Sequence, residues 1–175
     1  MKTIKEMDLP ELAAFVASHL ESREIPVVLV GGSCVSIYSD NRYQTHDLDF
    51  VERYYTKRSS LRAALAEIGF EEQNRYFVHP DAAYFLEFPT GPLSVGDAPV
   101  AELNRMPLET GVLTLLTPED CIRDRLTAYF HWNDRQSLEQ AVWVAQRHPF
   151  DVLRVEAWAL AEGMSGKFST FLERL

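Results

Sequence analysis

Two aspartates, Asp47 and Asp49, stand two residues apart in the largely apolar stretch HDLDFVE. Side chains alternate between the two faces of a β-strand, so both carboxylates are expected on one face and Leu48 and Phe50 on the other. Like charges this close repel each other until a cation binds, and paired carboxylates suit hard divalent ions such as Mg²⁺. The spacing therefore indicates a metal site, with solvated acids on an exposed strand edge as the alternative.

A glycine corner precedes this acidic strand. The apolar run VVLV ends at Gly31, Gly32 and Ser33, after which a short helix is expected. Glycines allow a sharp turn and let a ligand approach the backbone, while Ser33 adds a hydroxyl beside the free N–H groups of a helix start. Such a corner suits phosphate, and a tight strand-to-helix turn without a ligand is the alternative.

A third carboxylate, Glu87, lies in the segment AYFLEFP, which has the composition of a strand. On a strand next to the acidic one, Glu87 would complete an oxygen cage for one or two metal ions. On an edge strand near Pro89, it would instead face solvent. Arg42, in the loop before the acidic strand, is long enough to reach a phosphate, although most loop arginines are simply solvated.

Hydrophobic spacing and capping signals predict the elements that position these residues. Asp8-Leu-Pro-Glu11 is typical of a helix start, and this first helix is expected to end near Ser22. A second helix is expected over 57–70, closed by Gly69. Strands are expected at 26–32, 46–52, 74–79, 83–89, 92–96 and 111–116.

From Thr117 onward the pattern is helical. Thr117 and Pro118 resemble an N-cap with proline at the first helical position, and Asn133 or Asp134 is expected to cap a further helix. This order predicts an α+β protein. Residues 1–116 would form a mixed sheet flanked by helices, and residues 117–175 a helical region packed on that core.

Composition narrows the function classes. The 175 residues are 46% hydrophobic and 25% charged, as in an ordinary globular protein. The net charge of −9 argues against extended DNA binding. The two cysteines, Cys34 and Cys121, lack metal-type spacing. With no signal peptide and no run of roughly 20 apolar residues, a cytoplasmic protein without a membrane partner is expected.

The stretch from Pro26 to Val51 resembles the signature of the DNA polymerase β-like nucleotidyltransferase superfamily. The resemblance is carried by Gly31-Gly32-Ser33 after a strand, followed by a short helix, a loop and Thr45-His-Asp47-Leu-Asp49. It implies a nucleotidyltransferase-like fold that transfers a nucleoside monophosphate from a nucleoside triphosphate to a hydroxyl acceptor. Gly31, Gly32 and Ser33 would hold the nucleotide. Asp47, Asp49 and Glu87 would be the catalytic residues and would bind two Mg²⁺ ions.

The chain is more closely similar to small bacterial proteins grouped with the AbiEii toxins of type IV toxin-antitoxin systems. These share a Gly-Gly-Ser/Thr corner, an Asp-x-Asp strand, a later Pro-Glu-Asp segment (here 118–120) and a helical C-terminal half. The similarity implies a toxin with an antitoxin partner and with tRNA, a protein or a small molecule as acceptor.

AbiEii-type toxins carry a lysine on the helix after Pro-Glu-Asp and an aspartate further on. This chain has Arg123 or Arg125 and then Asp134, and the similarity implies that these residues bind nucleotide. Arginine binds phosphate bidentately but does not act as a base at neutral pH. Two alternatives therefore stay open: a catalytically weak or inactive nucleotide-binding module acting as sensor or partner protein, and a small-molecule transferase that modifies an antibiotic-like hydroxyl.

Overall fold

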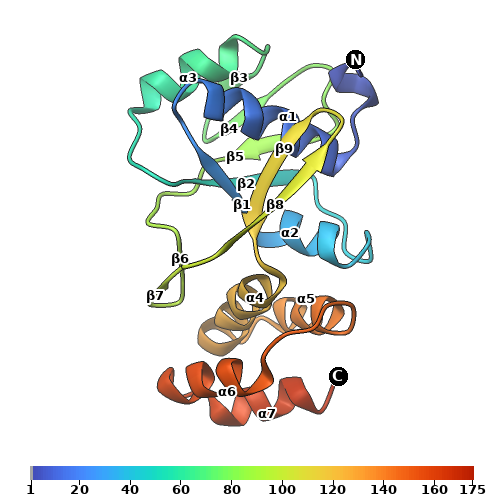
Figure 1. Ribbon diagram of the computed structural model, residues 1–175, viewed down its shortest axis with the longest axis vertical. Coiled ribbons are helices and arrows are strands. Elements are labelled where there is room, and N and C mark those ends of the chain that lie inside the picture. Colours follow the sequence, from blue (N-terminus) through green and yellow to red (C-terminus); the bar gives the residue numbers. More distant parts are fainter. Residues whose placement is uncertain (1) are drawn as a thin grey trace.

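A seven-stranded mixed sheet forms the centre of the molecule, and helices lie on both of its faces (Figure 1). The structure is a computed structural model that describes residues 2–175. Its helices are η1 (Ile4–Glu6), α1 (Leu9–Ser22), α2 (Gly31–Tyr38), α3 (Arg58–Ala66), α4 (Pro118–Trp132), α5 (Arg135–Ala145), α6 (Val152–Ala161) and α7 (Ser165–Leu172). Its strands are β1 (Val27–Val30), β2 (Asp47–Glu52), β3 (Glu71–Gln73), β4 (Tyr76–Val78), β5 (Phe85–Glu87), β6 (Ser94–Val95), β7 (Ala98–Pro99), β8 (Leu103–Leu108) and β9 (Gly111–Leu116).

The strand order of the large sheet is β3-β4-β5-β2-β1-β9-β8, and β6 and β7 form a separate hairpin. β1 and β2 are antiparallel, with Val30 opposite Asp49. β2 and β5 are parallel, with Asp49 opposite Glu87. Because β2 and β5 are neighbours within the sheet, the acidic positions of both strands come together.

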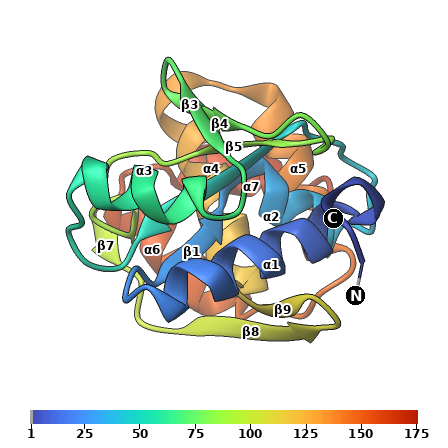
Figure 2. The same ribbon diagram turned by 90° about the horizontal axis from the view of Figure 1, so that it is seen from above.

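The helices form layers above and below this sheet. In the view of Figure 1, α1 and α3 lie on one side of the sheet, while α2 and the helices from α4 onward lie on the other. Figure 2 shows α1 crossing the face formed by β1 and β9, and α1 also packs on α3. α2 contacts β2, α4 and α5, so it joins the sheet to the C-terminal helices. Fully buried Leu12, Leu29, Phe50 and Leu115 belong to the core.

The predicted α+β class is confirmed, and the first helix ends at Ser22 as expected. The Asp134 side chain, rather than that of Asn133, caps α5, because it accepts hydrogen bonds from the backbone N–H groups of Gln136 and Ser137. Asn133 ends α4 in a left-handed conformation, with φ 53°. The division at residues 116 and 117 stays a prediction.

The strand β8 was not expected from the sequence. Its residues LNRMPL include Pro107, which removes a backbone donor and normally excludes a central strand. β8 lies at the end of the strand order and pairs only with β9 in the large sheet, so its other edge needs no donor. None of the helices within residues 2–175 combines the length and the apolar character that crossing a membrane requires.

Candidate active site

Three carboxylates from two parallel strands form an acid cluster, which consists of Asp47, Asp49 and Glu87. One carboxylate oxygen from each residue lies within 4.8 Å of the others, and all three side chains are half-buried. Asp47 and Asp49 share a face of β2 because of strand alternation. The parallel register of β5 then sets Glu87 beside Asp49.

The electrostatics of the acid cluster favour binding of a cation. Burial, together with the charges of Asp47 and Glu87, raises the pKa of Asp49 to about 7. Arg125 opposes this shift. The exposed Arg75 approaches Glu87, with 3.3 Å between Nε and Oε1. The three acids are therefore only partly compensated by the protein's own positive charge.

The donor set of this cluster fits Mg²⁺. Mg²⁺ takes oxygen ligands and is usually held by one or two carboxylates together with substrate phosphates and water. Three carboxylates that face one another provide such oxygens, whereas Zn²⁺ sites usually include histidine or cysteine. The Thr45 hydroxyl donates a hydrogen bond to Asp47 and so orients one of these ligands.

The glycine corner lies directly against the acid cluster. Gly31 has a φ of +67°, a left-handed conformation, and a Cβ at this position would come within 2.6 Å of the Asp49 carboxylate oxygen. At Gly32 a Cβ would come within 2.9 Å of the Tyr43 ring. Glycine is therefore required for both close approaches.

The Ser33 hydroxyl is used within the fold. Ser33 is fully buried, and its Oγ donates to the Val30 carbonyl at 2.9 Å. The sequence analysis expected this hydroxyl beside free N–H groups, where it would face a phosphate. The structure instead gives it a partner on β1, and the backbone at Gly31 is the part of the corner that touches the acid cluster.

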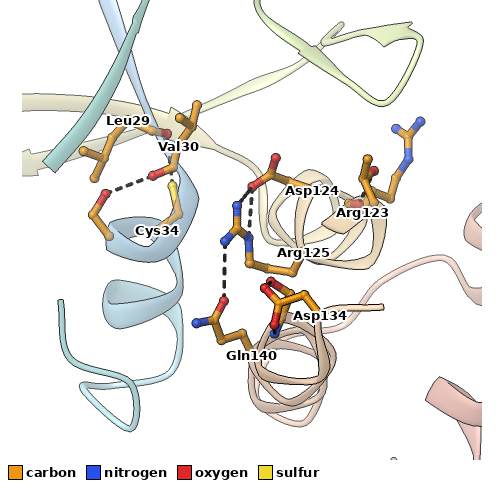
Figure 3. Close-up of polar contacts among 11 residues, drawn as sticks. Leu29, Val30, Cys34, Arg123, Asp124, Arg125, Asp134 and Gln140 are labelled. Atoms are coloured by element: carbon orange, nitrogen blue, oxygen red, sulfur yellow. Dashed lines mark hydrogen bonds and ion pairs between the residues drawn. The ribbon is translucent and has the colours of Figure 1, made fainter. Parts of the chain in front are cut away.

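Arg125 on α4 is the predicted basic residue that the structure brings toward the acids. Its Nε and Nη2 donate to the Asp124 carboxylate at 3.1 and 2.6 Å, and its Nη1 donates to Gln140 on α5 at 3.5 Å (Figure 3). Burial lowers the pKa of Arg125, but the charges of Asp124 and Asp49 help to raise it overall. Asp124 and Gln140 were not expected at the site from the sequence. Asp124 is adjacent to Arg125, which was a signal for it, whereas no pattern in the sequence marks Gln140.

Other predicted nucleotide-binding residues have partners elsewhere. Figure 3 shows Arg123 and Arg125 leaving α4 in different directions. Arg123 pairs with Asp120 at 2.8 Å and lies over the Trp158 ring at 5.0 Å. The structure therefore does not bring Arg123 to the acid cluster.

Arg42 and Asp134 are also engaged outside the acid cluster. Arg42 lies over the Trp143 ring at 5.1 Å and donates to Gln146. The Asp134 carboxylate caps α5 and accepts from the Ser137 hydroxyl at 2.8 Å. Hydrogen bonds from Ser137 lower the pKa of Asp134, and the charge of Arg125 contributes. Asp134 thus belongs to the surroundings of Arg125.

No family model matches the chain, and no curated protein matches it either. Solved structures do match the chain. An antigenic nucleotidyltransferase-like protein from Paracoccidioides brasiliensis superposes with a TM-score of 0.55 and 17% identity, over 77% of this chain and 75% of that chain. The antibiotic-resistance factor ANT(2'')-Ia in solution gives a TM-score of 0.52 and 13% identity, over 93% and 91% of the two chains.

A crystal structure of ANT(2'')-Ia in complex with adenylyl-2''-tobramycin gives a TM-score of 0.50 and 15% identity, over 95% of this chain and 97% of that chain. At these identities the comparisons concern the fold. The nucleotidyltransferase-like fold that the sequence resemblance implied is confirmed.

Proposed function

We propose that this protein is a Mg²⁺-dependent nucleotidyltransferase that moves a nucleoside monophosphate from a nucleoside triphosphate to a hydroxyl acceptor. One observation carries the proposal: the acid cluster, with donor oxygens within 4.8 Å of one another, lies against the glycine corner at Gly31. The nucleotidyltransferase-like fold supports it.

In the proposed reaction the acceptor hydroxyl oxygen forms a bond to the α-phosphorus and its proton is released to solvent. The bond between the α-phosphorus and the oxygen that bridges to the β-phosphate breaks, and pyrophosphate leaves. Asp47, Asp49 and Glu87 would hold Mg²⁺, and the bound ion would neutralise the charge on the attacking and leaving oxygens. Gly31 and Gly32 have no side chains, so the backbone leaves room for a triphosphate to approach the acids. Arg125 offsets phosphate charge from the α4 side.

Asp49 also makes cation binding dependent on pH in this proposal. With a pKa of about 7, its carboxyl holds a proton in a large share of molecules at neutral pH when no cation is bound. A metal ligand has to be deprotonated, so cation binding and proton release from Asp49 are coupled. We therefore expect the affinity for Mg²⁺ to rise with pH through this range.

The similarity to AbiEii-type proteins extends the proposal to a toxin-antitoxin toxin, with an antitoxin as partner and tRNA or a protein as acceptor. The ANT(2'')-Ia complex contains adenylyl-2''-tobramycin, so the acceptor hydroxyl of that protein belongs to a small molecule. A small-molecule hydroxyl is therefore the third acceptor class for this chain.

A catalytically weak nucleotide-binding module is the second candidate function. It is favoured by Arg125, which is already hydrogen-bonded to Asp124 and Gln140 and is one of the two arginines, with Arg123, that the AbiEii similarity offers in place of a lysine. The Ser33 hydroxyl also favours the module, because it is buried and already donates to the Val30 carbonyl. Such a module would bind nucleoside triphosphate with Mg²⁺ and release it unchanged.

A transfer assay separates the two candidates. The protein is incubated with each α-labelled nucleoside triphosphate and Mg²⁺, alone, with total tRNA and with an aminoglycoside panel. Label on one acceptor, lost with Asp47→Asn/Asp49→Asn and kept with the matched exposed-acid control Asp81→Asn, supports the enzyme. Nucleotide binding by calorimetry without label transfer supports the module, and absence of both contradicts the two proposals.

A further inference from the structure

A cavity of about 480 Å³ opens where β2 and β5 end, between the chain segments 52–58 and 88–92. Its apolar walls include Leu61 of α3, Phe88 and Pro92. A cavity of this size accommodates a small organic ligand. None of the three acid-cluster residues lines it, so it is a separate feature of the molecule.

This cavity lies on the other face of β2 from the acid cluster. Side chains alternate along a strand, so Glu52 shares a face with Phe50 rather than with Asp49. Phe88 stacks on Phe50 on that face, with ring centroids 5.8 Å apart. Asp49 and Glu52 are separated by roughly 10 Å along the strand. A ligand in the cavity would leave the acid cluster free.

Glu52 gives the cavity an acceptor that has no partner. Burial raises the pKa of Glu52, and the charge of Arg58 acts in the opposite direction. Within residues 2–175 the Glu52 carboxylate forms neither an ion pair nor a hydrogen bond. A carboxylate that has lost part of its hydration and has no donor within the chain gains from a ligand that brings N–H groups.

The two arginines at the cavity differ in whether their N–H donors are already engaged. Arg58 donates to Glu72 at 2.8 Å and lies 4.7 Å from the centre of the Phe77 ring, so its guanidinium is already committed. Arg53 lies over the Tyr54 ring at 5.8 Å and pairs with no acid in the part of the chain that the structure describes. Arg53 therefore has free donors for an anionic group.

Two neighbouring tyrosines form the exposed rim of the cavity. Tyr54 is 67% exposed and Tyr55 is 91% exposed. Contiguous exposed apolar patches mark interaction sites, and these two neighbouring rings both line the cavity. Their flat faces suit stacking with a planar ring, as in proteins that bind single nucleobases.

These groups together select one ligand chemistry. A cationic ligand would meet Arg53 and Arg58, and a bare anion would meet Glu52 and apolar walls. A planar, uncharged ring with two adjacent N–H donors and an attached phosphate suits Glu52, the tyrosine rings and Arg53 together. Among the nucleobases, guanine presents two such donors, N1–H and the N2 amino group, on one edge.

We propose that this cavity binds the guanine of a nucleotide, with Glu52 accepting from N1–H and N2–H, Tyr54 and Tyr55 stacking on the base, and Arg53 contacting the phosphate. The same chemistry is offered by a free guanine mononucleotide and by a guanosine at the end of a single-stranded RNA. The site does not depend on the nucleotidyl-transfer proposal, since it lies outside the acid cluster.

Calorimetric titration of the full chain in EDTA tests the proposal, with GMP, guanosine, AMP and CMP as probes. GMP is expected to bind at least tenfold more tightly than AMP or CMP, and Asp47→Asn/Asp49→Asn is expected to bind GMP as the wild type does. Because EDTA and these substitutions disable the acid cluster, failure here is distinguishable from failure of the proposed transfer activity.

Variants identify the contacts. Glu52→Gln keeps the shape of the side chain but replaces one acceptor oxygen with an NH₂ donor, and is expected to weaken GMP binding about tenfold or more. Tyr54→Ala/Tyr55→Ala should weaken it by about tenfold. Arg53→Ala should weaken GMP but not guanosine. Trp132→Ala removes another aromatic ring, 75% exposed and outside the cavity, and should change nothing.

A short single-stranded RNA ending in guanosine distinguishes the sources of the base. Affinity at least tenfold above that of GMP assigns an RNA end, and equal affinity assigns a free nucleotide. The proposal is overturned if GMP produces no binding heat at millimolar concentration, or if folded Glu52→Gln, verified by circular dichroism, binds GMP unchanged.

Discussion

The acid pair at the start of α4 consists of Glu119 and Asp120. It differs from the acid cluster on β2 and β5 in the partners of its carboxylates. Glu119 and Asp120 are each only 8% exposed. Glu119 accepts from Arg154 at 2.6 Å, and Asp120 accepts from Arg123 at 2.8 Å. Each acid of this pair has its own arginine inside the fold, although burial still raises the pKa of Asp120 against the charge of Arg123.

In the acid cluster, carboxylates face carboxylates. Burial and two like charges bring the pKa of Asp49 to about 7. Arg125, whose charge opposes that shift, is held by Asp124. The comparison teaches that acids paired within the chain serve the fold, whereas acids gathered against one another are only partly compensated and reduce stability until a cation binds.

The largest expected effect on nucleotide binding comes from removing the charge of the acid cluster. Asp47→Asn/Asp49→Asn should lower Mg²⁺-dependent nucleotide affinity by at least about a hundredfold, because two of the three ligand carboxylates are lost. Calorimetry with a non-hydrolysable triphosphate, with and without Mg²⁺, measures it. Unchanged affinity would show that the acid cluster is not the metal site.

Asp49→Asn alone should raise stability, with an effect that depends on pH. The pKa of Asp49 is about 7 in the folded protein and 3.8 in an unconstrained carboxyl, so folding favours the protonated form and ionisation costs up to about 4 kcal/mol. The advantage of the variant should be full above about pH 7 and disappear as pH falls toward about 4.

Thermal melting of both proteins in EDTA at several pH values measures this dependence. Mg²⁺ added at about pH 8 should raise the melting temperature of the wild type and leave that of Asp49→Asn nearly unchanged. A pH-independent difference between the two proteins would contradict the assigned electrostatics of the acid cluster.

Removing a carboxylate from the acid pair should lower stability, whereas Asp49→Asn should raise it. Glu119→Ala removes the acceptor of Arg154 and of the Asp151 N–H group, and should lower the free energy of unfolding by about 2 kcal/mol. Urea denaturation measures the loss. Mg²⁺-dependent nucleotide affinity should be unaffected in the folded variant, and a parallel loss would mean that the two regions are coupled.

The smallest effect is expected from Gly31→Ala. Its Cβ would lie 2.6 Å from the Asp49 carboxylate in a backbone with φ +67°, so Asp49 has to shift. We expect roughly tenfold lower nucleotide affinity, about 1.4 kcal/mol. Gly163→Ala is the matched control, because it also has positive φ but its Cβ would meet nothing within 4 Å. Equal effects on nucleotide affinity would assign the Gly31 result to backbone strain alone.

Much of the acid cluster follows from local sequence. Alternation along β2 sets Asp47 and Asp49 on one face, and the two glycines after an apolar run mark the corner. The capping signals at Asp8 and Thr117 predict the starts of α1 and α4, and both side chains accept hydrogen bonds at the third helical N–H. Periods and caps act over a few residues, so a single sequence carries them.

Long-range pairing and side-chain direction were decided by the tertiary structure. Glu87 reaches Asp49 only because β5 lies parallel to β2 in this register, which depends on how the whole sheet packs. Arg123 and Arg125 are two residues apart on one helix and therefore point in different directions, so the packing of α4 against α2 and α5 determines that Arg125 is directed toward the acids. The sequence thus determined which groups share a strand face or begin a helix, while the tertiary structure decided which of them meet, because contacts between distant segments depend on the packing of every element between them.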